Sequence, residues 1–295
     1  MWLLFILLST LAWAIVNILN SVLVHHYHKS PVLLSWLQSA ISLPLLGFVA
    51  LGADLDSSWA IIFVCTGISA YLADLWFFHA AHSLDISVLN IAWSILAIFL
   101  TIVGFFYFNE TWTIHQSLGS ALIIAGATIL AFCHRQDNFI HTLGVLIALA
   151  ALYVPYYAVK KAGIDEGVDA QTAFFWLLLG RELPSFFLPL FSKKTMALAL
   201  RTDRLNILLI GKSALIVLFY FFAEYFGTLA YEDGPLSLVA IVANTQPLVV
   251  IMCAAAFVFF WPQYAPKELL SVRSLQIKIS CFILTFVGLM FMPPY

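Results

Sequence analysis

Residues 69–81 read SAYLADLWFFHAA and place one acid, Asp74, inside a run of aromatic and aliphatic residues. The acid is unusual for this chain, because only 9% of its 295 residues are charged while 63% are hydrophobic. Soluble domains average about 25% charged residues, so this composition, with a mean hydropathy of +1.01, predicts a protein whose solvent is lipid. The net charge of −2 gives no sign of a nucleic-acid partner.

The apolar runs of the chain are each long enough for a helix that crosses a bilayer. About 20 apolar residues span roughly 30 Å of hydrocarbon, and such runs predict helices because lipid offers no partner to open backbone groups. Short polar connections such as GADLDSS (52–58) separate the runs. The expected fold is an all-α membrane protein with ten transmembrane helices, near 2–24, 31–51, 59–80, 86–108, 114–133, 139–159, 171–191, 205–230, 236–261 and 276–292.

An acid recurs at the matching place of the second half of the chain. YLADLWFFHA (71–80) aligns with FFAEYFGTLA (221–230) at an offset of 150 residues, and Asp74 then falls on Glu224. Before the longer connection of 192–204 the offset is 140, and it aligns Trp13 with Tyr153, Trp36 with Trp176, and Pro44 with Pro184. The pattern therefore predicts two related halves.

Each half holds five expected spans, and an odd number reverses the orientation of the second half in the membrane. The expected domains are 1–134 and 139–292, related as inverted repeats. Secondary transporters use this arrangement and bind their substrate near the interface between the repeats. The repeat thus predicts a transporter with a central site.

The chain resembles the drug/metabolite transporter superfamily in its EamA-like, ten-helix branch. FNETWTIHQSLG (108–119) is similar to the exit of that family's fourth span, with Glu110 in the typical place. GTLAYEDGPLSLVAIVANTQPLVV (227–250) is similar to its alanine-rich turn and to the span that ends in a proline, here Pro247. Arg181, in WLLLGRELP, stands where the family often has an arginine.

The resemblance implies a bundle around a central cavity, lined by the first, third and fourth helices and by the sixth, eighth and ninth. It also implies alternating access, commonly for the export of amino acids or other small metabolites, and often coupled to protons. The chain departs from the pattern at Ala97, where a proline is typical, and at Trp261-Pro262-Gln263, where the second glutamate turn is typical. The resemblance therefore implies transport and no particular substrate.

Five ionisable residues fall within the expected spans: Asp74, Arg181, Glu182, Lys212 and Glu224. Each costs roughly 2.5–3.5 kcal/mol at a helix centre, so such groups are usually functional or satisfied by a partner. With a rise of about 1.5 Å per residue, Asp74 and Glu224 lie roughly 9 Å below opposite faces, as two alternating gates would. Depth also permits Arg181 to pair with Glu224, and Lys212 to pair with Glu182 or with Asp74.

Three acids against two bases leave one acid without a fixed partner. The hypothesis is that Asp74 or Glu224 carries a coupling proton, and the alternative is that all five groups form structural ion pairs. Further candidates for the substrate cavity are aromatic and amide side chains: Trp13, Asn17, Trp93, Tyr153, Tyr157 and Asn244. These side chains suit an aromatic or amphipathic solute, although hydrogen bonding between helices is an equal alternative for each.

The favoured function is a secondary transporter, and not an enzyme, that exports a small metabolite by alternating access with protons as a coupling partner. A lipid-carrier flippase of the same fold is the alternative, and a membrane-embedded enzyme is less favoured because the loops offer no catalytic set. No cofactor motif and no metal-ligand spacing is present. The expected partners are the solute, protons and the bilayer, without nucleic acid, and a homodimer stays open.

We expect a multi-pass protein of the prokaryotic cytoplasmic (inner) membrane. Lys and Arg gather in the odd-numbered connections, and the even-numbered ones carry only Lys160 and Lys161. By the positive-inside rule this distribution puts both termini outside the cytoplasm. The resemblance implies cytoplasmic termini instead, so the orientation stays open.

Overall fold

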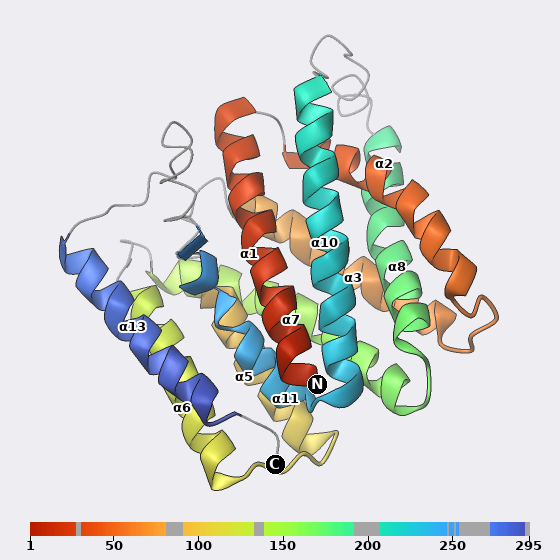
Figure 1. Ribbon diagram of the computed structural model, residues 1–295. Helices are drawn as coiled ribbons and strands as arrows, with labels where there is room; N and C mark the ends of the chain where they lie inside the picture. The colour runs from red at the N-terminus through yellow and green to blue at the C-terminus, as the bar shows by residue number, and fades with distance from the viewer. Residues whose placement is uncertain are drawn as a thin grey trace.

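The computed structural model describes residues 1–27, 31–80, 91–132, 139–191, 207–246, 248–250, 252–253 and 272–292. All regular structure within these ranges is helical (Figure 1). One short 3-10 helix, η1 (Ala50–Gly52), accompanies ten α-helices: α1 (Trp2–Tyr27), α2 (Pro31–Val49), α3 (Ala60–Ala80), α5 (Ile91–Phe106), α6 (Ile114–Phe132), α7 (Phe139–Asp165), α8 (Ala170–Phe191), α10 (Ile207–Asp233), α11 (Leu236–Ala243) and α13 (Val272–Met290).

Each of these ten α-helices coincides with one expected span, so the predicted all-α membrane fold is confirmed. Five of them, α1, α2, α3, α7 and α10, are long and apolar enough to cross a bilayer by length and composition. Shorter apolar stretches lie in α5, α6, α11 and α13. Four residues on which the resemblance was assessed lie outside the described residues: Pro247, Trp261, Pro262 and Gln263.

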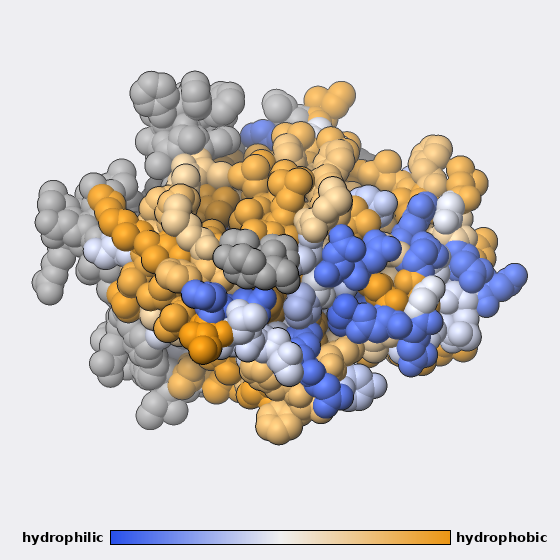
Figure 2. All heavy atoms as spheres, turned by 60° about the horizontal axis from the view of Figure 1, so that its bottom comes forward, coloured by the Kyte–Doolittle hydropathy of each residue, from blue (hydrophilic) through white to orange (hydrophobic). Residues whose placement is uncertain are grey.

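The outside of the bundle is apolar, as lipid requires. Large hydrophobic side chains are exposed along the helices, among them Leu11, Ile61, Phe106, Leu215 and Phe286. Figure 2 shows this apolar surface together with polar residues gathered at one end of the bundle. Soluble monomers rarely expose apolar surface on this scale, so these side chains face the acyl chains of the membrane.

The helices pack in pairs that are distant in the sequence. α1 lies along α10, α3 packs against both α7 and α8, and α5 packs against both α7 and α11. α2 packs against α8, and α6 pairs with α13 at one side of the bundle (Figure 1). α1 begins and α13 ends at the same end of the bundle, the bottom in Figure 1, as an even number of spans requires.

Glycines allow two of these helix pairs to meet at backbone contact. A Cβ atom at Gly67 of α3 or at Gly180 of α8 would overlap the backbone of the opposite helix. A Cβ at Gly119 of α6 would lie 2.7 Å from the carbonyl oxygen of Gly288 of α13, and the reverse distance is also 2.7 Å. Small residues at such crossings are typical of helices that associate in lipid. Gly180 directly precedes Arg181, so the close α3–α8 crossing brings this arginine up to α3.

Glu110, which the resemblance placed at the exit of a span, caps the N-terminus of α11. Its carboxylate accepts hydrogen bonds from the backbone N–H groups of Leu236 and Ser237 and from the Ser237 hydroxyl. A negative charge at a helix N-terminus is favourable, because the first N–H groups of a helix have no partner within it. Asn109, with a φ of 52°, turns the chain directly before Glu110.

The α3–α8 crossing gives a direct prediction for stability. Gly180→Ala should lower the free energy of unfolding by about 1–3 kcal/mol, because the added methyl group has no room against the backbone of α3. Gly211→Ala in α10 is the matched control, since nothing lies within 4 Å of the position its Cβ would take. Thermal unfolding of both variants in lipid nanodiscs measures the difference, and equal midpoints would contradict the packing described.

Candidate functional site

The described residues of the bundle line a larger and a smaller cavity. The larger has a volume of about 140 Å³ and is lined from α1, α2, α3, α5, α7, α8 and α10. The smaller has a volume of about 60 Å³ and is lined from α1, α5, α7, α10, α11 and the residues that follow α11. Trp13, Trp93 and Tyr157 line both cavities, so an aromatic layer lies between them.

The cavities follow one another along the length of the bundle. On α1 the smaller cavity is lined from Ile6 to Trp13 and the larger from Trp13 to Asn20. On α10 the larger is lined from Ile216 to Tyr220 and the smaller from Ala223 to Tyr231. A solute that moved from one cavity to the other would therefore move across the membrane.

A charge network lies between the cavities and is centred on Arg181. The Arg181 guanidinium donates from Nε to Asp74 Oδ2 at 2.6 Å and from Nη2 to Asp74 Oδ1 at 2.9 Å. Its third nitrogen, Nη1, donates to Glu224 Oε1 at 3.1 Å. Asp74 lines the larger cavity and Glu224 the smaller, so one arginine connects the two.

Glu224 has a second cation, and both acids have a tyrosine. Lys160 Nζ lies 3.0 Å from Glu224 Oε2, and Tyr156 donates to the same oxygen at 3.1 Å. Tyr153 donates its hydroxyl proton to Asp74. The network thus contains two acids and two bases, which neutralise each other where water is scarce.

Aromatic faces surround both cations. The Arg181 guanidinium lies 5.0 Å from the ring centre of Tyr220 and 5.9 Å from that of Trp13. Lys160 Nζ lies 4.5 Å from the ring centre of Tyr156. Ring faces attract cations, and the attraction is strongest where water is excluded.

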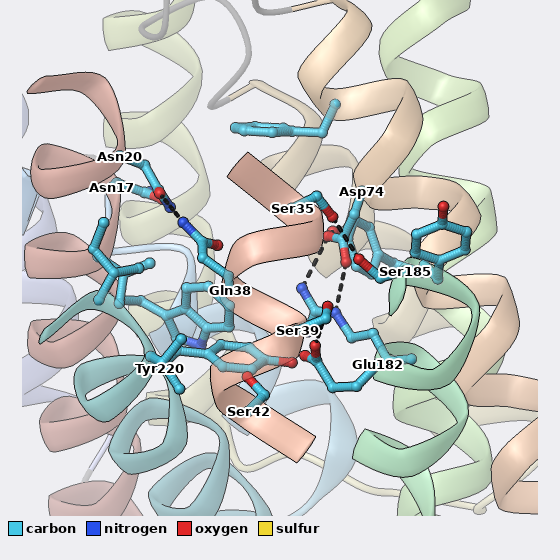
Figure 3. A pocket seen from close by; sticks show the side chains of 18 of the residues that line it. Asn17, Asn20, Ser35, Gln38, Ser39, Ser42, Asp74, Glu182, Ser185 and Tyr220 are labelled. Carbon is cyan, nitrogen blue, oxygen red and sulfur yellow. Dashed lines mark hydrogen bonds and ion pairs between the residues drawn. The ribbon is translucent and has the colours of Figure 1, made fainter. Parts of the chain in front are cut away.

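Glu182 is the third acid that lines these cavities, and its surroundings differ from those of Asp74 and Glu224. Only 6% of it is exposed, and Ser39 donates to its Oε2 at 2.5 Å. Within the described ranges no Lys, Arg or His nitrogen lies within 4.0 Å of its carboxylate. Figure 3 shows the Glu182 carboxyl group in the larger cavity, beside Ser39 and Tyr220.

Hydroxyl and amide groups form the rest of the polar wall of the larger cavity (Figure 3). Gln38 donates to Asn20 at 2.8 Å, and Ser35 lies 2.7 Å from Ser185. Three further lining groups have no hydrogen-bond partner among the described residues: Ser42 Oγ, Tyr220 OH and Trp93 Nε1. Buried polar groups are rarely left without a partner, so these three groups are available to a ligand or to water.

Most of the residues singled out from the sequence meet at these cavities. The larger is lined by Trp13, Asn17, Asp74, Trp93, Tyr153, Tyr157, Arg181 and Glu182, and the smaller by Glu224 and Asn244 as well. The expected pairing of Arg181 with Glu224 is found. Lys212 is among the lining residues of neither cavity. The roles suggested for these residues stay predictions.

Two expectations about depth and pairing are wrong. Asp74 and Glu224 do not lie near opposite faces, because a single guanidinium binds both. Asp74 is held by Arg181 and Tyr153 rather than by Lys212. The depth argument assumed that Glu224 lies as close to the end of its helix as Asp74 does, but α10 continues to Asp233.

Lys160 was missed by sequence reasoning, because the expected span ended at residue 159. α7 continues to Asp165, so Lys160 and Lys161 lie within a helix and are buried, rather than in a connection. A signal was present: Lys160 follows Tyr156 and Tyr157 on a helix whose apolar character does not stop at 159. Tyr220, Ser39 and Gln38 were also missed, and their types alone gave no sign of a cavity.

The ten α-helices of the described ranges, with an apolar outside and a charged layer between internal cavities, define a multi-pass membrane protein. Residues 1–132 match the EamA-like transporter family, a domain of the drug/metabolite transporter superfamily, so the resemblance seen in the sequence is confirmed there. The match indicates a membrane transporter of the drug/metabolite type.

One solved crystal structure aligns with 98% of this chain and 95% of its own chain at a TM-score of 0.66 and 14% identity. At this identity the likeness shows the fold alone, and it extends the shared architecture beyond the residues of the family match. A comparison with curated proteins found no match.

The network predicts a large loss of stability when Arg181 is removed. Arg181→Gln should lower the free energy of unfolding by about 3–5 kcal/mol, because it leaves Asp74 facing Glu224 without the cation between them. Glu166→Gln is the control, since Glu166 is exposed and substitutions at such positions usually change stability by about 0.5 kcal/mol or less. Chemical unfolding in mild detergent compares the two. Equal losses would show that Arg181 does not carry this network.

Proposed function

We propose that this chain is a secondary transporter that moves a small, amphipathic metabolite by alternating access. The observation that carries the proposal is the pair of cavities that follow one another along α1 and α10 and are separated by a charged, aromatic layer. A solute cannot cross this layer unless the helices rearrange, and such a rearrangement is the defining step of alternating access. The family match over residues 1–132 supports transport as the function.

The position of Arg181 supports a rearrangement of this kind. In the structure it binds Asp74 of α3 through two nitrogens and Glu224 of α10 through one. Because either acid can satisfy the guanidinium, movement of α3 relative to α10 can strengthen one ion pair as it weakens the other. Two arrangements of similar energy are the requirement for a switch between states.

We also propose that the halves 1–134 and 139–292 are inverted repeats. The counterparts five spans apart are α1 and α7, α3 and α10, and α5 and α11. When each helix is replaced by its counterpart, the α1–α10 contact becomes α7–α3, and the α5–α7 contact becomes α11–α1. All four contacts are present in the structure. The same exchange leaves the α2–α8, α5–α11 and α6–α13 pairs unchanged, as a two-fold axis would. At the α5–α11 contact Ser94 donates to Asn244 at 2.9 Å, and these residues are matched at the offset of 150.

The distribution of charge supports export. At the end of the bundle where α1 begins, the described helix ends and connections carry exposed acids and no exposed Lys or Arg: Asp54, Asp56, Asp165, Glu166, Asp169, Glu232 and Asp233. At the opposite end α8 ends at Phe191 and α10 begins at Ile207, and the sequence between them, 192–206, carries four basic residues. The positive-inside rule puts the basic end in the cytoplasm and the termini outside. The larger cavity lies nearer that end, where a solute bound for export would enter.

Cysteine labelling tests alternating access without knowledge of the solute. The four native cysteines would be replaced by alanine, and one cysteine introduced at Ser42 of the larger cavity or at Ala240 of the smaller. With a membrane-impermeant maleimide, Ser42→Cys should react from the side of the basic connections and Ala240→Cys from the opposite side. Oriented vesicles of both polarities measure the two rates.

The control for this experiment is a lipid-facing position. Ile61→Cys lies on the exposed apolar surface and should react slowly from both sides. Reaction of Ser42→Cys and Ala240→Cys from one and the same side would indicate a continuous channel or a blind pocket, and either result would overturn the transporter proposal. Reaction of both at the rate of Ile61→Cys would show that neither cavity is reached by water.

A further inference from the structure

The cations around the two cavities are already neutralised by carboxylates of the protein. All three nitrogens of Arg181 donate to Asp74 or Glu224, and Lys160 lies against Glu224. An anionic group of a ligand would therefore meet cations whose charge is already balanced, and no further Lys or Arg is among the described residues that line the larger cavity. The network that holds the helices together thus disfavours acidic solutes at this place.

The acid that remains is Glu182. Ser39 supplies one hydrogen bond to Oε2, and the Tyr220 hydroxyl lies beside the carboxyl group (Figure 3), but no described Lys, Arg or His nitrogen lies within 4.0 Å of it. An ionised carboxylate buried to this degree is costly without a cation, so it either takes up a proton or binds a cation that arrives from solution. Its place in the cavity makes it accessible to such a cation (Figure 3).

The walls around Glu182 suit the organic part of a cation. Aromatic rings attract positive charge through their faces. Seven aromatic side chains line the larger cavity: Trp13, Tyr71, Phe77, Trp93, Tyr153, Tyr157 and Tyr220. The volume of about 140 Å³ is close to that of an engineered protein cavity, about 150 Å³, that holds benzene. The cavity therefore fits a single ring with a short substituent, and the Ser42 hydroxyl and the Tyr220 hydroxyl beside Glu182 can accept from an ammonium N–H.

We propose that Glu182 binds the ammonium group of a small amine whose remaining part is an apolar ring or chain, and that the same carboxyl group holds a proton when the amine is absent. Binding then exchanges one proton for one organic cation at a single carboxylate. This inference deepens the proposed transport function and names the chemical class of its solute. The binding step itself can be measured without any transport.

The exchange predicts that lower pH weakens amine binding. The charged and titratable groups that face Glu182 from the helices packed against α8 are Asp74 and Tyr71 of α3, Tyr153 of α7, and Tyr220 and Glu224 of α10, with Arg181 on α8 itself. The described part of α2 contributes Ser39 and no titratable group. Asp74 and Glu224 are paired with Arg181, so Glu182 is the group whose protonation competes with the amine.

Calorimetry on the purified chain in nanodiscs tests the inference with three ligands that share a phenylethyl group and differ in the charge of their polar end: 2-phenylethylamine, 2-phenylethanol and 3-phenylpropanoate. The amine should bind at least about tenfold more tightly than the other two, since a hydrogen bond between charged groups is the stronger kind. Its affinity should fall with pH, and buffers of different ionisation enthalpy should register proton release on binding. Glu182→Gln should lose the preference for the amine, while Glu232→Gln, at an exposed position, should keep it.

Each outcome decides the inference. Equal binding of the amine and the alcohol to the wild-type chain would overturn the inference. This comparison needs no variant, so it still decides the inference if the Glu182→Gln chain fails to fold. Retention of the amine preference in folded Glu182→Gln would also overturn it. Transport assays in proteoliposomes separate the two proposals. If the amine binds through Glu182 but is not transported, the transport proposal alone is refuted. If the wild-type and Glu182→Gln chains transport the amine equally, the role of Glu182 alone is refuted.

Discussion

The structure depends on one shared ion pair. Arg181 of α8 is held by Asp74 of α3 and by Glu224 of α10, and each of the three groups is removed from water by the others and by aromatic rings. Among the described residues Asp74 has no other cation and Arg181 no other carboxylate, so the three helices cannot separate without a large loss of free energy. The close crossing at Gly67 and Gly180 is what allows the guanidinium to reach α3.

The shared pair also determines where the free space of the bundle lies. Because Asp74 borders the larger cavity and Glu224 the smaller, the charges divide what would otherwise be a continuous path. The same pairing leaves Glu182 as the buried acid that no described cation reaches. A structural requirement, the neutralisation of Arg181, thus separates a carboxylate that stabilises the fold from one that is available to a ligand.

Much of this could be predicted from the sequence, because lipid constrains a chain strongly. The apolar runs predicted all ten helices, and the rarity of charge drew attention to Asp74, Arg181, Glu182 and Glu224, which all line the cavities. The pairing of Arg181 with Glu224 followed from depth alone. These successes rest on helix length and on the cost of buried charge, which are local properties.

The failures arise where helix ends and lateral packing decide. α7 and α10 extend past the apolar runs that defined them, so Lys160 lies inside the bundle and Glu224 lies farther from the end of its helix than expected. Counting residues along single helices also cannot show which helices are in contact. The α3–α8 crossing that joins Asp74 to Arg181 depends on Gly67 and Gly180, and nothing in the sequence indicates that these two glycines meet. Side chains such as Ser39 and Tyr220 acquire meaning only from that packing.

The most direct measurement is the energetic coupling of Asp74 and Glu224 in a mutant cycle of unfolding free energies. If both acids bind one arginine, the double variant Asp74→Asn, Glu224→Gln should lose more stability than the sum of the single variants, by about 0.5–3 kcal/mol. In an Arg181→Gln background this excess should vanish, because the residue that links the two acids is gone. Additive losses within about 0.3–0.5 kcal/mol in the presence of Arg181 would contradict the account.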